Sequence, residues 1–163
     1  MLRQVSELEA ILNELIAEHQ RLLKHLLSQQ TAMKQFDIKT MDVTANFQEA
    51  SRLRIATLET KRRLIVSQLS RLQGTRMDLT IADIARLVPQ RSEVLLSQRA
   101  TLKELIQQVS SRAQIAGKLA GAVLGHLNTI VRLLAGAVEK AGLYTKHGVP
   151  QVSSRIGVME AVG

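Results

Sequence analysis

The sequence lacks cysteine and tryptophan and contains few other aromatic residues. Its 163 residues include two Phe and one Tyr. The absence of cysteine excludes disulfides, thiol catalysis and zinc–thiolate sites, and it is compatible with a reducing cytoplasm. Apolar residues, mostly Leu, Ile, Val and Ala, still make up 45% of the chain. Because ligand pockets are usually rich in aromatic residues and helical cores are aliphatic, this composition favours a protein of long helices.

Glycine and proline are also scarce, and neither occurs before Gly74. In the first part of this glycine- and proline-free segment, apolar residues recur at alternating steps of three and four positions. The first series is Val5, Leu8, Leu12, Leu15, His19, Leu22, Leu26, Gln29, Met33 and Phe36. This spacing predicts an amphipathic helix of about 30 residues, and Ile11, Ile16, Leu23 and Leu27 widen its stripe enough to contact more than one neighbour.

Helix start and stop signals divide the rest of the chain. Asp37 can cap a second helix over residues 38–73, which Gly74 ends. Its first half carries a poorer apolar pattern, so we expect that half to be the less buried. Thr80 and Asp83 resemble a capping box for a short helix before Pro89. A third long helix is expected over residues 92–141.

We therefore predict an all-α fold, an elongated antiparallel bundle of three long helices plus one short connector helix. Residues 1–142 are expected to form the helical bundle domain. Residues 143–163 contain Gly, Pro and Ser without a sustained period, so we expect a flexible C-terminal tail.

The net charge of +8 is concentrated after residue 37, with ten Lys/Arg against five Asp/Glu in residues 38–91. The cluster Lys61-Arg62-Arg63 could neutralise nucleic-acid phosphates. Stacking aromatics and a reading motif are missing, so a solvated basic face is the favoured interpretation.

Neither the N-terminal residues nor the most apolar stretch predicts a membrane segment. The first helix carries several glutamates where a secretory signal would be uncharged. Residues 119–131 are apolar, but His126 and Asn128 interrupt them and Lys118 and Arg132 flank them. We expect a cytoplasmic protein without membrane insertion.

No residue pattern indicates catalysis. The four His are far apart, and none lies in a spacing that holds a metal on one helix face. No Gly-rich phosphate loop follows a strand. We therefore predict no catalytic residue, metal, cofactor or small-molecule substrate, and hence no enzyme.

The second half of the third long helix is apolar on more than one face. Within it Gly117, Gly121 and Gly125 recur at every fourth residue, although each Gly in a helix costs about 0.5–1 kcal/mol relative to Ala. Either another segment of the chain packs closely here, or the small residues line a groove for a partner helix.

Four motifs along the chain resemble the FlgN-type flagellar export chaperones, which serve hook–filament junction proteins. They are Leu8-x-x-Ile11-Leu12-x-x-Leu15-x-x-Glu18-x-x-x-Leu22-Leu23-x-x-Leu26, Phe36-Asp37-x-x-x-Met41, Leu124-x-x-x-Asn128-x-x-Val131-x-x-Leu134 and Tyr144-x-x-x-Gly148. The resemblance covers essentially the whole chain. The high basic charge and the three spaced glycines depart from the family's usual pattern.

The resemblance implies a chaperone that holds the C-terminal amphipathic helix of a junction protein and delivers it to the export gate. Its implied partner-binding residues are Leu119, Val123, Leu127, Ile130, Leu134 and Val138. Tyr144 resembles the residue that contacts the flagellar export apparatus. Two alternatives stay open, a self-assembling coiled-coil adaptor and a basic nucleic-acid-binding protein, and a homo-oligomer is compatible with the pattern.

Overall fold

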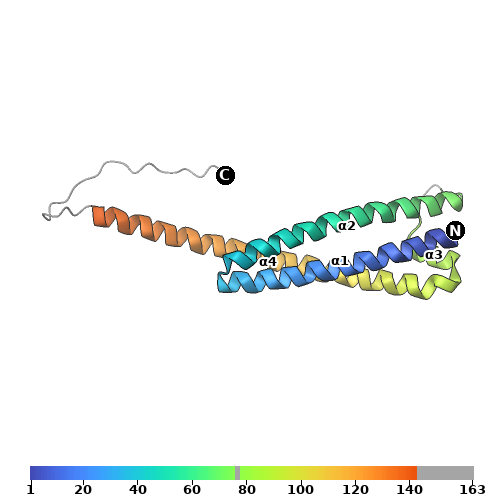
Figure 1. Ribbon diagram of the computed structural model, residues 1–163, viewed down its shortest axis with the longest axis horizontal. Coiled ribbons are helices and arrows are strands. Elements are labelled where there is room, and N and C mark those ends of the chain that lie inside the picture. The colour runs from blue at the N-terminus through green and yellow to red at the C-terminus, as the bar shows by residue number, and fades with distance from the viewer. Residues whose placement is uncertain (76–77, 143–163) are drawn as a thin grey trace. The chain divides into compact units, whose positions relative to one another are not determined.

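The computed structural model describes residues 1–75 and 78–142, with side chains as far as residue 136 (Figure 1). The α-helices are α1 (Leu2–Gln35), α2 (Ile38–Leu72), α3 (Ile81–Leu87) and α4 (Ser92–Gly142), and a 3-10 turn, η1 (Pro89–Arg91), precedes α4. The described residues contain no strand. The predicted all-α fold, with three long helices and one short connector helix, is confirmed.

The chain divides into two compact units, Met1–Ala120 and Gly121–Gly163, and α4 contributes residues to both. The domain boundary that the sequence suggests after residue 142 stays a prediction. The expected tail, 143–163, lies outside the described residues.

Within the first unit, the long helices run up, down and up. α1 and α2 lie side by side in opposite directions (Figure 1). The start of α4 lies beside the start of α1, and the Gln98 side-chain amide donates a hydrogen bond to the Glu9 carbonyl oxygen there at 3.0 Å. Further along both helices, the Gln30 side-chain amide donates to the Arg112 carbonyl oxygen at 2.9 Å. α1 and α4 are therefore parallel, and α2 runs antiparallel to both.

The core of the first unit follows the apolar series on α1. Val5, Leu8, Leu12 and Leu15 have no exposed surface. The other buried members of this cluster are Leu58, Ile65, Val66, Leu69, Ile84, Ala85, Val88, Leu95 and Leu102. A smaller cluster, made of Leu22, Leu26 and Ala116, continues the core along the bundle. All three long helices and α3 thus contribute apolar side chains to the core.

The last residue of the α1 series departs from the prediction. Phe36 is 51% exposed and adopts the left-handed conformation, with φ at 55°. Its N–H donates to the Met33 carbonyl oxygen at 3.3 Å, and the Asp37 N–H donates to the Ala32 carbonyl oxygen at 2.9 Å. Phe36 therefore ends the helix instead of extending its buried face.

The predicted helix caps are confirmed. The Asp37 carboxylate accepts hydrogen bonds from the Thr40 N–H at 3.0 Å and from the Thr40 hydroxyl at 2.6 Å. These bonds hold the pKa of Asp37 below its ordinary value. Gly74 has φ at 69°, the left-handed turn expected after α2. Thr80 and Asp83 form the reciprocal capping box at the start of α3.

The first half of α2 contributes polar residues to the interior. Thr44, Gln48 and Ser51 are buried, although an apolar pattern does not single them out. The Gln48 side-chain amide donates to the Gln29 side-chain oxygen on α1 at 2.8 Å. The Thr44 hydroxyl donates to the Thr40 carbonyl oxygen at 2.7 Å. The Gln48–Gln29 hydrogen bond therefore links this half of α2 to α1, whereas the Thr44 hydrogen bond stays within α2.

Candidate partner-binding surfaces

The burial of α4 decreases from the beginning of the helix towards its end. Leu95, Gln98, Leu102 and Leu105 are buried, as their heptad spacing predicts. Ala116 is the last buried residue among the described side chains of α4. Beyond it the sequence stays apolar while its side chains become half-buried or exposed. The distal part of α4 therefore carries many apolar side chains that are not fully buried.

The second unit exposes most of the predicted partner-binding residues it contains. Leu127, Ile130 and Leu134 are 43%, 39% and 61% exposed, whereas Val123 is half-buried. Leu119, which belongs to the first unit, is also half-buried. Their helical spacing places Leu127, Ile130 and Leu134 on one side of α4. The side chain of Val138, and Tyr144 altogether, lie outside the described residues.

Three further apolar residues are more exposed than any member of the predicted set whose side chain is described. They are Leu124, Val131 and Leu133, each more than three-fifths exposed. Two of them belong to the motif that carries the family resemblance, yet the sequence did not place them in the binding set. The signal that could have found them is the absence of a polar face opposite the predicted stripe. The exposed apolar surface of the second unit is therefore wider than one stripe.

The spaced glycines do not mark a close approach within the described residues. A Cβ atom added at Gly117, Gly121 or Gly125 would meet no atom within 4 Å outside its own helical neighbourhood. These three positions therefore have room for a Cβ among the described residues. The other possibility, contact with a partner, remains a prediction.

One helix among the described residues is long and apolar enough to cross a membrane by length and composition. It covers Pro89–Gly136, and its most apolar window has a mean hydropathy of 1.3. None of that window is buried. Length and composition alone are weak evidence for insertion, because helices with other roles meet the same criteria. An apolar helix that binds a partner also needs exposed apolar side chains.

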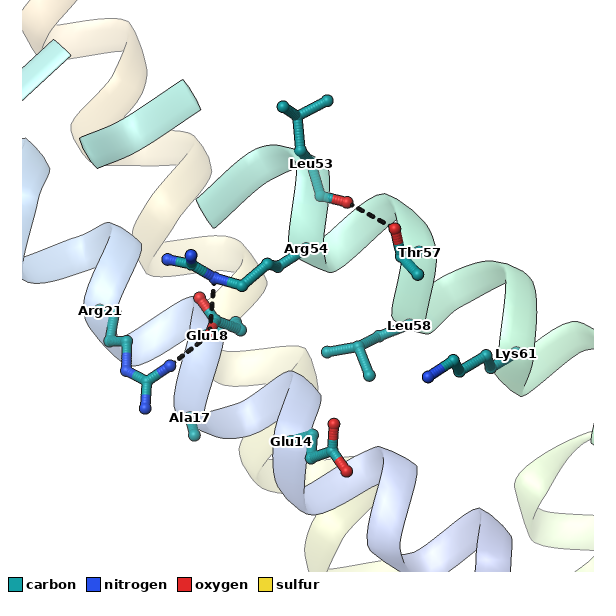
Figure 2. A pocket seen from close by; sticks show the side chains of 9 residues that line it. All are labelled: Glu14, Ala17, Glu18, Arg21, Leu53, Arg54, Thr57, Leu58 and Lys61. Carbon is teal, nitrogen blue, oxygen red and sulfur yellow. Dashed lines mark hydrogen bonds and ion pairs between the residues drawn. The ribbon is translucent and has the colours of Figure 1, made fainter. Parts of the chain in front are cut away.

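A second surface lies between α1 and α2, at a cleft of about 510 Å³ (Figure 2). Glu14, Ala17, Glu18 and Arg21 line it from α1, and Leu53, Arg54, Thr57, Leu58 and Lys61 line it from α2. Acidic and basic side chains therefore face one another across a partly apolar floor.

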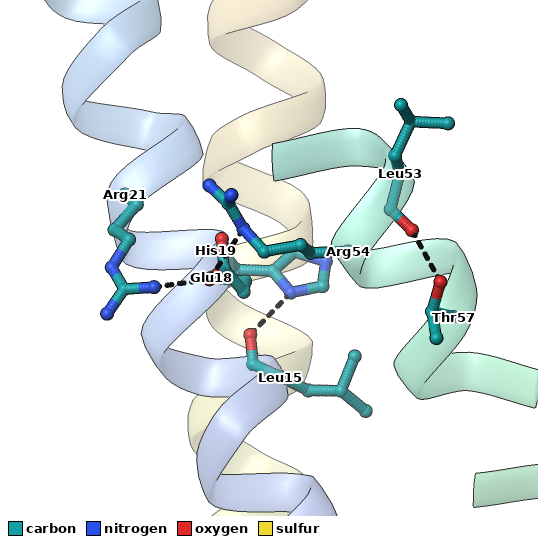
Figure 3. Close-up of polar contacts among 7 residues, drawn as sticks. All are labelled: Leu15, Glu18, His19, Arg21, Leu53, Arg54 and Thr57. Atoms are coloured by element: carbon teal, nitrogen blue, oxygen red, sulfur yellow. Dashed lines mark hydrogen bonds and ion pairs between the residues drawn. The ribbon is translucent and has the colours of Figure 1, made fainter. Parts of the chain in front are cut away.

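Glu18 is the buried charge of this cleft, with only 5% of its surface exposed. Its Oε1 atom accepts from Arg54 Nε at 3.0 Å and also from Arg21 Nη1 (Figure 3). Burial opposes ionisation of this carboxyl group, but the two guanidinium groups outweigh it and hold its pKa below the ordinary value. The neighbouring His19 is also buried, and its Nδ1 lies 2.8 Å from the Leu15 carbonyl oxygen. Of these contacts, the Glu18–Arg54 pair ties α1 to α2.

The basic cluster of α2 is partly neutralised by its own helix. Arg62 Nε and Nη2 contact the Glu59 carboxylate at 2.9–3.1 Å, a two-pronged contact one turn away. Arg52 lies 3.9 Å from Glu49. The Arg62–Glu59 pair is half-buried and the Arg52–Glu49 pair is exposed, and the interpretation of the cluster as a solvated basic face stays a prediction. Among the described residues, no group of three or more His, Cys, Asp or Glu side chains could hold a metal ion.

Comparison with known proteins identifies the family. The family model described as "FlgN protein" matches residues 1–151. No curated protein and no solved structure matches the chain. The family match covers most of the chain, including all of the described residues. The chain therefore belongs to the FlgN family of flagellar export chaperones.

Proposed function

We propose that this chaperone binds the C-terminal amphipathic helix of a hook–filament junction protein and delivers it to the flagellar export gate. The exposed apolar side chains of the second unit carry the proposal. Leu127, Ile130 and Leu134 present an apolar side of α4 that the described residues leave exposed. An amphipathic helix laid along them would bury its own apolar stripe at the same time. Held in this way, the junction protein could not assemble before export.

Burial of these leucine side chains against a partner helix would supply favourable free energy for binding. Fully burying one leucine side chain contributes about 1.5–3 kcal/mol. Several such contacts can offset the loss of freedom when two proteins associate. Family membership supports the choice of partner class, because FlgN proteins in general are cytoplasmic chaperones of hook-associated proteins.

The test compares two double variants of the full chain. Leu127→Ala/Leu134→Ala shortens two residues of the proposed surface. Leu87→Ala/Leu72→Ala is the matched control, because these leucines of the first unit are 41% and 58% exposed against 43% and 61%. Calorimetric titration with the junction protein should show binding weakened roughly 30- to 150-fold by the first variant, equivalent to about 2–3 kcal/mol. The control should bind like the unmodified chain.

The partner side is tested by removing the C-terminal helix of the junction protein. We expect this deletion to abolish binding while the rest of the junction protein stays folded. Unchanged binding after the deletion would contradict the proposal, as would equal weakening by the two double variants.

Tyr144 is proposed as a contact with the export gate on the family resemblance alone. Tyr144→Phe and Tyr144→Ala should both leave affinity for the junction protein unchanged. If the aromatic ring makes the contact, only Tyr144→Ala loses binding to the cytoplasmic part of the gate in a pull-down assay. Loss of junction-protein binding in Tyr144→Ala would refute this division of roles.

A further inference from the structure

The cleft between α1 and α2 continues towards the beginning of α1. A second hollow of about 320 Å³ is lined by Glu7, Ala10, Ile11, Lys61, Leu64 and Ile65. It shares Lys61 with the first cleft, so the two hollows form one continuous strip within the first unit. We call this strip the α1–α2 face and define it by Ala10, Glu14, Ala17, Leu53, Lys61 and Leu64.

The two walls of the α1–α2 face differ in side-chain size. α1 contributes the small residues Ala10 and Ala17. α2 contributes Leu53 and Leu64, which are 62% and 58% exposed. Leu53 lines the same cleft as Ala17, and Leu64 lines the same hollow as Ala10. Each exposed leucine therefore shares a hollow with an alanine of the opposite wall.

The two walls also differ in charge. Glu14 stands on α1 and Lys61 stands on α2, on opposite sides of the same cleft (Figure 2). Among the described residues, neither side chain has an ion-pair partner, in contrast to Glu18 beside them, which has two arginine partners. One negative and one positive side chain thus remain available at one level of the face.

We propose that a second copy of this chain packs on the α1–α2 face, about a two-fold axis parallel to the helices. Such an axis places α1 of each copy over α2 of the other without shifting any residue along the bundle. Leu53 and Leu64 of one copy then lie over Ala17 and Ala10 of the other. Glu14 of each copy lies opposite Lys61 of its partner. The face is complementary to itself in both size and charge, as a two-fold interface requires.

The other two-fold arrangement lacks this complementarity. An axis across the helices would place α1 over α1 and α2 over α2. The exposed leucines would then meet leucines, and Glu14 would face the acidic wall of the partner. Like charges across an interface disfavour association. The parallel axis is therefore the arrangement that the residues support.

The decisive experiment uses two charge reversals in the full chain. Glu14→Lys makes both walls basic, and Lys61→Glu makes both walls acidic. In sedimentation equilibrium, the unmodified protein should form a dimer, and each variant alone should dissociate at least tenfold more readily. An equimolar mixture of the two variants should regain the dimer, because every contact then pairs a basic wall with an acidic one. A change within one chain cannot produce recovery on mixing.

Two controls separate the interface from general charge effects and from folding. Glu104→Lys and Lys103→Glu reverse exposed charges on α4 and should leave the dimer intact. Leu53→Ala/Leu64→Ala keeps every charge and should weaken the dimer about 100-fold or more, because four side chains are shortened per dimer. Circular dichroism should show the same helicity in all variants.

Three results would overturn the proposal. The first is an unmodified protein that stays monomeric over a roughly hundredfold range of concentration, where mass action would reveal a dimer. The second is a mixture of the two charge variants that stays monomeric. The third is a dimer weakened by Leu127→Ala/Leu134→Ala and unaffected by Glu14→Lys, which would assign self-association to the second unit. The proposal does not depend on the junction-protein function, which uses other residues.

Discussion

Replacing Arg54 by Met tests whether the buried carboxylate of Glu18 ties α1 to α2. Arg54 Nε donates to Glu18 Oε1 at 3.0 Å, and the Glu18 side chain is 6% exposed. A hydrogen bond to a charged group contributes about 1.5–3 kcal/mol. Because the Arg54 side chain is 52% exposed, solvent weakens the pair. We expect Arg54→Met to lower the free energy of unfolding by about 1–2 kcal/mol near neutral pH.

The matched control is Arg52→Met on the same helix. Arg52 pairs with Glu49 at 3.9 Å, and both side chains are about three-fifths exposed. Such a surface pair contributes about 0–1 kcal/mol, so its loss should be barely measurable. Urea denaturation followed by circular dichroism gives both free energies. Equal losses in the two variants would refute the reasoning, because they would show that burial of Glu18 adds nothing to the pair.

The pH dependence gives an independent check on the same pair. The pKa of Glu18 is held below its ordinary value of 4.5 in the folded chain. A carboxyl group with a lowered folded pKa stabilises the fold above its unfolded pKa, and this contribution is lost as the pH falls through the folded pKa. The difference between the unmodified chain and Arg54→Met should therefore be largest near neutral pH and shrink below about pH 4.5. A difference that stays constant down to about pH 3 would contradict this mechanism.

Three further predictions concern the core, a cap and a glycine, and denaturation monitored by circular dichroism measures each. Leu12→Ala should destabilise the fold by about 2–5 kcal/mol because Leu12 has no exposed surface, and a loss below about 1 kcal/mol would place it outside a packed core. Asp37→Ala should destabilise α2, and this effect should disappear in acid as the native carboxylate, whose pKa is lowered, becomes protonated. Gly117→Ala should stabilise the fold by about 0.5–1 kcal/mol because a Cβ meets nothing within 4 Å, and destabilisation would reveal an undescribed close neighbour.

The sequence predicted the helices well because their signals are local. Period and caps depend on residues a few positions apart, so Asp37, Gly74 and the Thr80–Asp83 box could be found without knowledge of the fold. Phe36 could not be placed correctly in this way. Its apolar side chain continues the series, but its backbone takes the left-handed turn that ends α1. Side-chain type alone does not report such a backbone conformation.

The candidate surfaces were less predictable because exposure depends on distant segments. The same apolar period runs through Leu95 and Leu133, yet Leu95 has no exposed surface and Leu133 is 68% exposed. Leu95 is buried because it packs in the core cluster with residues of α1 and α2. The cleft at Glu18 was missed for the same reason, since Glu14 and Glu18 have the spacing of a solvated helix face. In the structure Glu18 is buried and pairs with Arg54 on α2, whereas Glu14 is exposed.

The buried glutamines of the first unit have a consequence for the alignment of the helices. A leucine seam repeats every seven residues, so a slip of one heptad would still bring leucine against leucine. Gln98 and Gln30 each donate a hydrogen bond from one long helix to a specific acceptor on another. A shift by one heptad would leave these buried amides without hydrogen-bond acceptors, at a cost of about 1–3 kcal/mol each. The glutamines therefore fix one register of the long helices among several that would pack their leucines almost equally well.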